Sequence, residues 1–350
     1  MSHNKRIFSV TIAGVVALLC LALPLVGYVG FNVLQKVTPS PDGLLSGIPS
    51  IPAVLPTGNA SPAPVCGGPA SMSILLIGSD SRADNYYTGL SDSMRIVRAD
   101  FVHPGIMSLT FQRDLYVAIP GISDHAGITH GKLNQAYLYG NPGFGYYDGP
   151  GQGPGLLAAT LEQNFGAHVD HYVALNTATF VRVVDTLGGI DINLPHAVDG
   201  RVKGSRDPNL IFPAGTQHLD GYHTMLLARL RPQGDLERSA VQNLILQALA
   251  AKILSPSALP QMPRVVEAFY GAVQTDLNGD DIARLLCLGS LVTPDKFVSV
   301  DFPADLFTGT RVQDPVLGYT FVWDVDFNML RAYVQYFNQG AWPQTPPPTP

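Results

Sequence analysis

An uncharged apolar run near the N-terminus constrains this chain more than any other feature. No residue between Ile7 and Gln35 is charged. As a helix, residues 7–34 extend about 42 Å, which exceeds the hydrocarbon core of a bilayer, about 30 Å. A cleaved signal peptide, the alternative, has an apolar region of roughly 7–15 residues, so the length favours a transmembrane helix. By the positive-inside rule, Lys5 and Arg6 predict that residues 1–6 lie in the cytoplasm and that the residues after 36 lie outside the cell.

The residues after this run have the composition of a spacer. Eight prolines and five glycines lie between Thr38 and Ser71, with Asp42 as the one charged residue. Residues 35–71 are therefore predicted to be a partly extended extracytoplasmic linker, and the Pro-rich tail 340–350 is predicted to be disordered. Cys66 and Cys287 would both be extracytoplasmic. They can pair in an oxidising compartment or remain two thiols, and the sequence leaves both open.

The remaining residues, 72–339, carry the signature of one folded body. Alternating strand and helix patterns, with an early hairpin, predict a three-layer α-β-α domain around a mixed central sheet. Strands are predicted at 73–78, 94–102, 106–111, 170–176, 190–194 and 296–301. Helices are predicted at 155–166, 177–189 (capped by Thr177), 222–229, 235–254, 263–273, 278–291 and 325–338. A glycine- and tyrosine-rich stretch, 137–155, is predicted to be a loop, either a lid or a plain surface loop.

Composition and missing motifs exclude several functions. The chain has 27 acidic and 21 basic residues, which argues against a protein that grips nucleic acid over a broad face. The sequence contains no P-loop, no GxSxG elbow, no GxGxxG and no HExxH motif, so nucleotide-binding, serine-hydrolase and zinc-protease functions have no support.

Two aspartates mark the first candidate site. Asp80 follows the buried strand 73–78, and Asp92 begins the next strand, so the two carboxylates are expected to meet near the ends of adjacent strands. Paired carboxylates repel unless a cation or a proton joins them, and Mg²⁺ bound by two carboxylates and substrate phosphates would satisfy both. Alternatively, each aspartate is an ordinary turn or cap residue.

A second candidate is the pair Arg113 and Asp114, which interrupts two strand-like runs at a sheet end. It is either a surface salt bridge or a ligand with its orienting partner. The sequence favours neither.

The segment 219–242 is more informative. Arg229 and Arg231 end one helix, and Arg238 and Gln242 lie on one face of the next. That face continues as Ile245, Leu249 and Ile253, so the polar groups share the stripe that faces the core. Three guanidiniums near a helix start form a natural phosphate receptor. A structural Arg–Asp network is the alternative.

These segments together resemble the LytR-CpsA-Psr family. The similar stretches are LLIGSDSR, SDSM, RDLYVAIPG, KLNQAY, VDTLGGIDINLP and LDGYHTMLLARLRPQGDLERSAVQ, in the family's order, over roughly residues 72–254. A single N-terminal span followed by an outside domain is also the family's arrangement.

The resemblance implies a membrane-anchored, Mg²⁺-dependent phosphotransferase. Such proteins move a glycopolymer from a polyprenyl-pyrophosphate carrier to a peptidoglycan hydroxyl, with the lipid tail in an apolar tunnel. By position, Asp80 and Asp92 match the metal and catalytic acids. The residues that match the pyrophosphate-binding set are Arg113 (also catalytic), Arg229, Arg231 and Arg238, with Gln242 nearby.

The chain also departs from the family pattern. Leu90 and Val241 replace common arginines, and Gln112 replaces a proline. Arg82 or Arg95 are candidates to supply the missing charge. The departures keep two other functions open: a non-catalytic polyprenyl-phosphate binding protein, and a hydrolase of the same carrier. Neither the glycopolymer, the acceptor nor the oligomeric state follows from the sequence.

Overall fold

The computed structural model describes most of the chain from residue 62 onward. The described residues are 62–81, 86–125, 127–201, 207–230, 241–242, 244–245, 248–249, 251–252, 261, 264–265, 272–293 and 296–347. The predicted cytoplasmic end and the predicted transmembrane helix, 7–34, lie outside them. Within these ranges, none of the helices combines the length and the apolar character needed to cross a bilayer.

A six-stranded mixed sheet forms the centre of the molecule, as predicted. Its strand order is β11-β6-β1-β2-β3-β12, with parallel pairs β1–β6 and β3–β12 and antiparallel pairs elsewhere. The strands are β1 (Ser71–Ser79), β2 (Ser91–Asp100), β3 (Gly105–Phe111), β6 (His171–Asn176), β11 (Val273–Thr275) and β12 (Phe297–Asp301). The predicted β2–β3 hairpin is confirmed.

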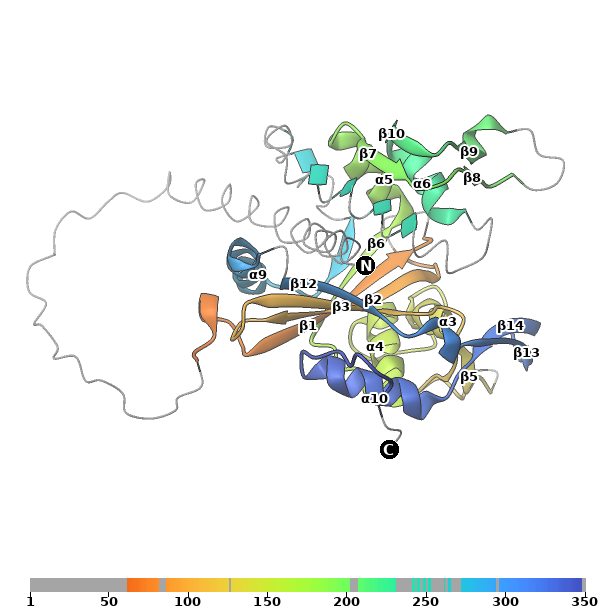
Figure 1. The fold of residues 1–350 in the computed structure, drawn as a ribbon. Coiled ribbons are helices and arrows are strands. Elements are labelled where there is room, and N and C mark those ends of the chain that lie inside the picture. Colours follow the sequence, from red (N-terminus) through yellow and green to blue (C-terminus); the bar gives the residue numbers. More distant parts are fainter. Residues whose placement is uncertain are drawn as a thin grey trace, which may run out of the picture.

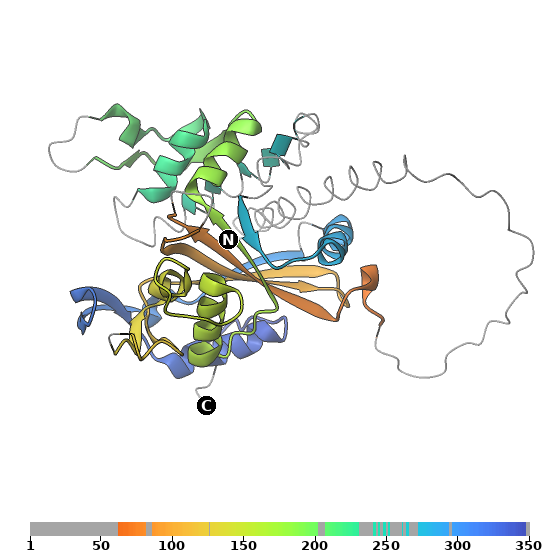
Figure 2. The same ribbon diagram turned by 180° about the vertical axis from the view of Figure 1, so that it is seen from behind.

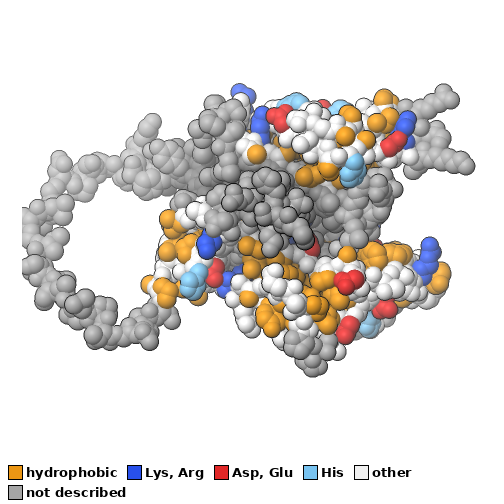
Figure 3. All heavy atoms as spheres, in the orientation of Figure 1, with side chains coloured by type: hydrophobic (Ala, Val, Ile, Leu, Met, Phe, Trp, Pro, Cys, Tyr) orange, Lys and Arg blue, Asp and Glu red, His pale blue; other side chains and the backbone are white. Residues whose placement is uncertain are grey.

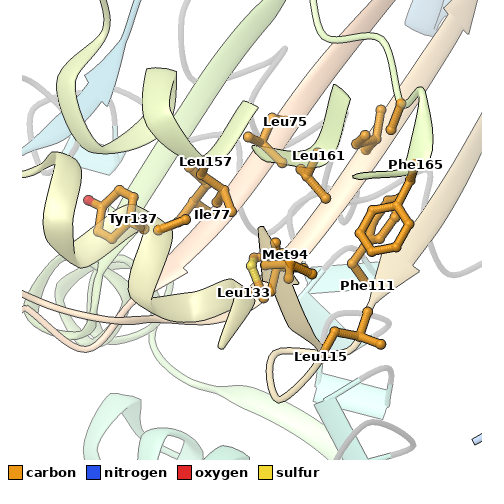
Figure 4. Close-up of a cluster of buried hydrophobic side chains, with 14 of the residues drawn as sticks. Leu75, Ile77, Met94, Phe111, Leu115, Leu133, Tyr137, Leu157, Leu161 and Phe165 are labelled. Atoms are coloured by element: carbon orange, nitrogen blue, oxygen red, sulfur yellow. The ribbon is translucent and has the colours of Figure 1, made fainter. Parts of the chain in front are cut away.

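Helices cover both faces of this sheet (Figure 1; Figure 2). On one face lie α3 (Leu133–Gly140), α4 (Gln152–Phe165) and α10 (Phe327–Asn338). Side chains alternate along a strand, so Leu75 and Ile77 of β1 pack with Leu157 and Leu161 of α4 in this layer's core (Figure 4). The layer on the other face includes α9 (Gly279–Leu291). Sheet and helices thus bury apolar side chains on both sides.

The alternate residues of the strands form the second core. Met72 and Ile74 of β1 pack with Leu285 and Leu288 of α9. Asn278 caps this helix through its side chain, which accepts from the amides of Asp280 and Asp281, and such a cap satisfies donors that a helix start leaves open.

A third group of helices sits at one end of the sheet. It contains α5 (Thr177–Thr186) and α6 (Gly221–Arg229), with a small sheet of β7 (Ile190–Leu194) and β10 (Gly215–Leu219). Val184, Ile190, Leu227 and Ile245 belong to its buried core. This group forms a wall above one half of the central sheet (Figure 1).

Several short elements were not predicted. They include the hairpin of β13 (Thr308–Asp314) and β14 (Gly318–Asp324), and β10 (Gly215–Leu219), which pairs with the predicted strand β7. Two short pairs were also missed: β4 (Tyr116–Ala118) with β5 (His130–Lys132), and β8 (Val198–Asp199) with β9 (Ile211–Phe212). The 3-10 turns η1 (Val65–Gly67), η2 (Pro208–Leu210) and η5 (Ala304–Leu306) complete the set. Most are two or three residues long and β13 is polar, so these carry no apolar period that would identify them. β14 is the exception, since Tyr319, Phe321 and Trp323 alternate along it.

Three local predictions are wrong. The cap of α5 is Asn176, whose side chain accepts from the Thr179 amide, and not Thr177. Residues 137–155 are not one loop, since α3 and α4 occupy both ends, and Tyr137 and Tyr139 are buried. Residue 273 belongs to β11 rather than to the predicted helix 263–273, because it pairs with β6.

The folded body extends further at both ends than the predicted boundaries. The Val65 amide donates to the Phe101 carbonyl, and Cys66 forms a disulfide with Cys287 of α9, so the last residues of the predicted linker belong to the domain. At the other end, Trp342 packs against Phe302 and Tyr333. Aromatic packing therefore continues into the tail that was predicted to be disordered.

Candidate functional site

A cavity of about 420 Å³ lies between the central sheet and the α5–α6 wall. Its polar lining residues are Ser79, Asp80, Asp92, Ser93, Arg95, Asn176, Thr177, Arg229 and Gln242, and its apolar lining includes Leu76, Ile77, Val173, Leu175, Phe180, Met225, Ala228 and Ile245. One cavity thus joins charged groups to an apolar interior. A ligand with a charged head and an apolar tail matches that lining.

The floor of the cavity is the face of the sheet. Leu76 pairs with Arg95 on β2 and with Val173 on β6, and Gly78 pairs with Ser93 and Leu175 in the same way. Paired residues present their side chains on one face. A Cβ atom at Gly78 would lie 3.2 Å from Cβ of Ser93, so the glycine lets β1 and β2 approach here without a side chain between them.

Asp80 lies where β1 ends and closes the loop that leads to β2. Its Oδ1 accepts from the Leu90 amide at 2.6 Å, and its own amide donates to the Leu90 carbonyl at 3.0 Å. Gly89 has a φ of 146°, and a Cβ there would lie 2.7 Å from Ser79 Oγ, so the turn requires glycine. The closed loop brings Asp80 and Asp92 to the same cavity.

A row of charged side chains holds Asp92 in position. Its Oδ1 accepts from Nη1 of Arg113 at 2.5 Å, and Nε of Arg113 donates to Asp114 Oδ2 at 3.1 Å. Nζ of Lys132 lies 2.8 Å from Asp114 Oδ1. Burial alone raises the pKa of Asp114, but Lys132 and Arg113 outweigh it, and the pKa is below its ordinary value.

These contacts exclude one of the two interpretations of Arg113 and Asp114. Asp114 is 4 % exposed, so the pair is not a surface salt bridge. Arg113 links the buried Asp114 to the cavity acid Asp92, and Asp114 fixes the orientation of its guanidinium. Arg113 itself is not among the residues that line the cavity.

The α6 side supplies two more of the predicted site residues. Arg229, in the last turn of α6, and Gln242 both line the cavity. Nε2 of Gln242 donates to the Ala228 carbonyl at 3.0 Å, which fastens its helical segment to the end of α6. Arg231 and Arg238 lie outside the described residues, as does Arg82.

The N-terminus of α5 completes the polar end of the cavity. Asn176 and Thr177 line it, and the Asn176 amide donates to the hydroxyl of Tyr86 at 2.9 Å. That hydroxyl also lies 2.6 Å from the Ala272 carbonyl. Tyr86 therefore connects the Asp80–Asp92 loop to the start of α5.

The donor set at this end fits a magnesium ion. Two carboxylate residues, Asp80 and Asp92, line one cavity together with the hydroxyl residues Ser79 and Thr177. Mg²⁺ prefers oxygen ligands, and one or two carboxylates are usual when a substrate phosphate supplies the others. Within the described part of the chain, no group of three His, Cys, Asp or Glu side chains is gathered as a metal site, so an ion here would rely on phosphate oxygens.

The positions that depart from the family pattern have structural roles of their own. Leu90 contributes its backbone to the Asp80 turn. Val241 is 6 % exposed and belongs to the core of the α5–α6 group. The Gln112 carbonyl accepts from the Leu115 amide. Val241 is thus a core residue and is not among the residues that line the cavity.

Two residues around the site were missed as functional residues. Lys132 lies in the KLNQAY stretch, but its pairing with Asp114 crosses from β5 to the end of β3. Arg95 was considered only as a substitute charge. The sequence feature that could have identified Arg95 is its position within a strand. The residues that follow it on the same face, Val97 and Ala99, are apolar and buried.

Comparisons with known proteins agree with this architecture. A sequence model of the LytR_cpsA_psr family matches residues 65–316. The polyisoprenyl-teichoic acid–peptidoglycan teichoic acid transferase TagU of Oceanobacillus iheyensis is 31 % identical over 62 % of this chain and 62 % of its own length. The regulatory protein MsrR of Staphylococcus aureus (strain COL) is 27 % identical over 60 % of this chain and 58 % of its own. The chain thus spans about three fifths of these curated relatives.

The solved structures include a similar fold. The crystal structure of Bacillus subtilis TagV superposes with a TM-score of 0.57 at 25 % identity, covering 78 % of this chain and 98 % of the other.

Proposed function

Because the chain belongs to the LytR-CpsA-Psr family, we propose that it is a phosphotransferase of the cell wall. It moves a glycopolymer from a polyprenyl-pyrophosphate carrier to a peptidoglycan hydroxyl outside the cell, with Mg²⁺, and residues 7–34 anchor it in the membrane. The observation that carries this proposal is the cavity that places Asp80, Asp92 and Arg229 beside an apolar interior. Curated relatives named as teichoic acid transferases support it.

The proposed reaction is an in-line displacement at phosphorus. The acceptor oxygen forms a bond to the phosphorus that bears the glycopolymer, and the bond from that phosphorus to the bridging oxygen breaks. Polyprenyl monophosphate leaves with the electron pair. Asp92 takes the proton of the acceptor hydroxyl, in the position where Arg113 holds it.

Charge grows on the leaving phosphate as its bond breaks, and preplaced cations stabilise it. Arg229 is the described guanidinium at the α6 side of the cavity, and Arg231 and Arg238 are proposed to join it. A Mg²⁺ ion, which Asp80 and Asp92 would hold, supplies further neutralisation of the pyrophosphate oxygens. The apolar lining takes the first isoprene units and keeps water away from the phosphates.

A second candidate is a carrier-binding protein without catalysis. The buried position of Val241 favours it, because no guanidinium reaches the ligand from there. A carrier hydrolase is the third outcome that an experiment must separate.

The test uses the full chain in lipid nanodiscs with a prenyl-pyrophosphate-linked sugar, Mg²⁺ and a peptidoglycan fragment. A sugar joined to the fragment through a phosphodiester supports the transferase. Free sugar phosphate or inorganic phosphate identifies the hydrolase, and saturable binding without either product identifies the binding protein. Arg331→Ala is the control, since its guanidinium contacts Asn164 and Asn328 away from the cavity.

A further inference from the structure

A strip of buried hydroxyl groups lies beside the cavity floor on the same face of the sheet. Thr110 of β3 pairs with Arg95 of β2. Ser108 of β3 pairs with Ser299 of β12. Because Ile106 and Phe297, two residues before Ser108 and Ser299, face the α9 layer, all four side chains are on that face of the sheet.

The hydroxyls of this strip have no hydrogen-bond partner among the described residues. Ser108 Oγ, Thr110 Oγ1 and Ser299 Oγ are buried and make no hydrogen bond to any residue that the structure describes. Ser108 is 1 % exposed and Thr110 is 9 % exposed. Most buried polar atoms in folded proteins are paired, so three unpaired hydroxyls on adjacent strands indicate a polar group that joins them.

Arg95 gives the strip a charge and connects it to the cavity. Its side chain is 6 % exposed and lines the cavity floor. Burial lowers the pKa of Arg95, while the charge of Asp301 opposes that effect. Asp301 pairs with Thr110 from the other side and is exposed. A guanidinium beside Ser and Thr hydroxyls is a donor set for phosphate oxygens.

We propose that Arg95, Thr110, Ser108 and Ser299 form a second anion subsite, which takes a phosphate group next to the cavity floor. This subsite is separate from the end of the cavity that Asp80 and Asp92 line. Arg95 follows Asp92 by three residues along β2, and its partner Thr110 lies on β3, one strand further from β1. The phosphate is either that of a prenyl lipid or a free ion. In the lipid form the inference rests on the proposed function, and the subsite then holds the monophosphate that the reaction releases.

The test measures ligand affinity of the full chain in nanodiscs by calorimetry. The probes are geranyl phosphate, geranyl pyrophosphate, geraniol and inorganic phosphate. The variants are Arg95→Met and Thr110→Val, which remove the charge and one hydroxyl with little change in volume. Thr160→Val is the matched control, since Thr160 is buried on the other face and its hydroxyl donates to the Leu156 carbonyl at 2.7 Å.

Arg95→Met should weaken the binding of geranyl phosphate by at least about tenfold, and Thr110→Val should weaken it by about threefold or more. The affinity for geraniol should not change. Without ligand, Thr110→Val should keep or raise the midpoint of thermal unfolding, because no hydrogen bond is lost, whereas Thr160→Val should lower it. Inorganic phosphate that shows the same dependence on both residues identifies the free ion as the ligand.

Unchanged affinity of a bound prenyl phosphate in both variants would overturn the subsite, and the hydroxyls would then hold water. If the wild type binds no prenyl phosphate, the proposed function fails. In that case the subsite proposal stands only if inorganic phosphate binds and its binding requires both Arg95 and Thr110. If inorganic phosphate does not bind either, the subsite proposal is wrong as well.

Discussion

Asp92, which lines the cavity, accepts a hydrogen bond from Nη1 of Arg113 at 2.5 Å. The position of Asp92 at the proposed reaction centre therefore depends on the guanidinium of Arg113, which Asp114 holds in turn. Substitutions of Arg113 and of Asp114 both test this relationship.

Removing that guanidinium should separate function from folding. Arg113→Ala is expected to cut glycopolymer transfer by at least about tenfold, since Asp92 loses its orientation and the site loses a cation. The control is Arg98→Ala, which breaks the Arg98–Asp100 pair further along β2 but leaves the cavity intact. The measurement is the rate of transfer at saturating carrier. Equal rates in the wild type and Arg113→Ala would contradict the role of Arg113.

Metal dependence should follow Asp80. Asp80→Asn keeps a side-chain oxygen for the Leu90 amide but removes the negative charge that a magnesium ion needs. We expect transfer to stop on addition of EDTA, to return with Mg²⁺ in the wild type, and to remain absent in Asp80→Asn. Asp100→Asn is a matched control, since Asp100 also accepts from loop amides. Full activity in EDTA would rule out the metal.

Acid should weaken the chain of charges behind the cavity. The pKa of Asp114 is lowered in the folded protein. Its ionised form therefore stabilises the fold at pH values above the pKa of the unfolded chain, which is about 4. This contribution is lost as the pH falls through the pKa of the folded protein. At pH 7, Asp114→Asn should lower the free energy of unfolding by about 3 kcal/mol, as measured by urea denaturation. The difference from the wild type should narrow below about pH 4. A difference that is the same at pH 7 and pH 3 would contradict this.

The disulfide should stabilise the whole domain. Cys66 and Cys287 are 221 residues apart, and a cross-link over a long loop removes conformations from the unfolded chain. Reduction, or the double substitution Cys66→Ser and Cys287→Ser, is expected to lower the free energy of unfolding by about 2–5 kcal/mol. The check is thermal unfolding with and without reductant. The reductant should not change the midpoint of the double variant.

Restoring the arginine that the family pattern suggests at residue 241 should harm this protein. Val241 is buried in the core of the α5–α6 group, so Val241→Arg places a charge there and should cost at least about 3 kcal/mol. Val241→Ala, which only shortens the side chain, should cost less. Val241→Arg with unchanged stability and faster transfer would show that the position faces the ligand.

On the face drawn in Figure 3, charged side chains of the described residues lie at separated places rather than in one patch.

The elements with strong local patterns could be predicted from the amino-acid sequence alone. The apolar run 73–78, the hairpin of β2 and β3, and the amphipathic helices α4 and α10 follow from periodicity within short windows. Asp80 and Asp92 could be expected to meet because they are linked by one turn between antiparallel neighbours.

Contacts between groups that are far apart in the sequence could not be predicted in this way. Lys132 reaches Asp114, Gln242 reaches the end of α6, and Arg95 stands beside Thr110 and the cavity. Each of these contacts depends on strand register or helix packing, which local patterns leave open because one residue of register moves a side chain to the opposite face of a sheet.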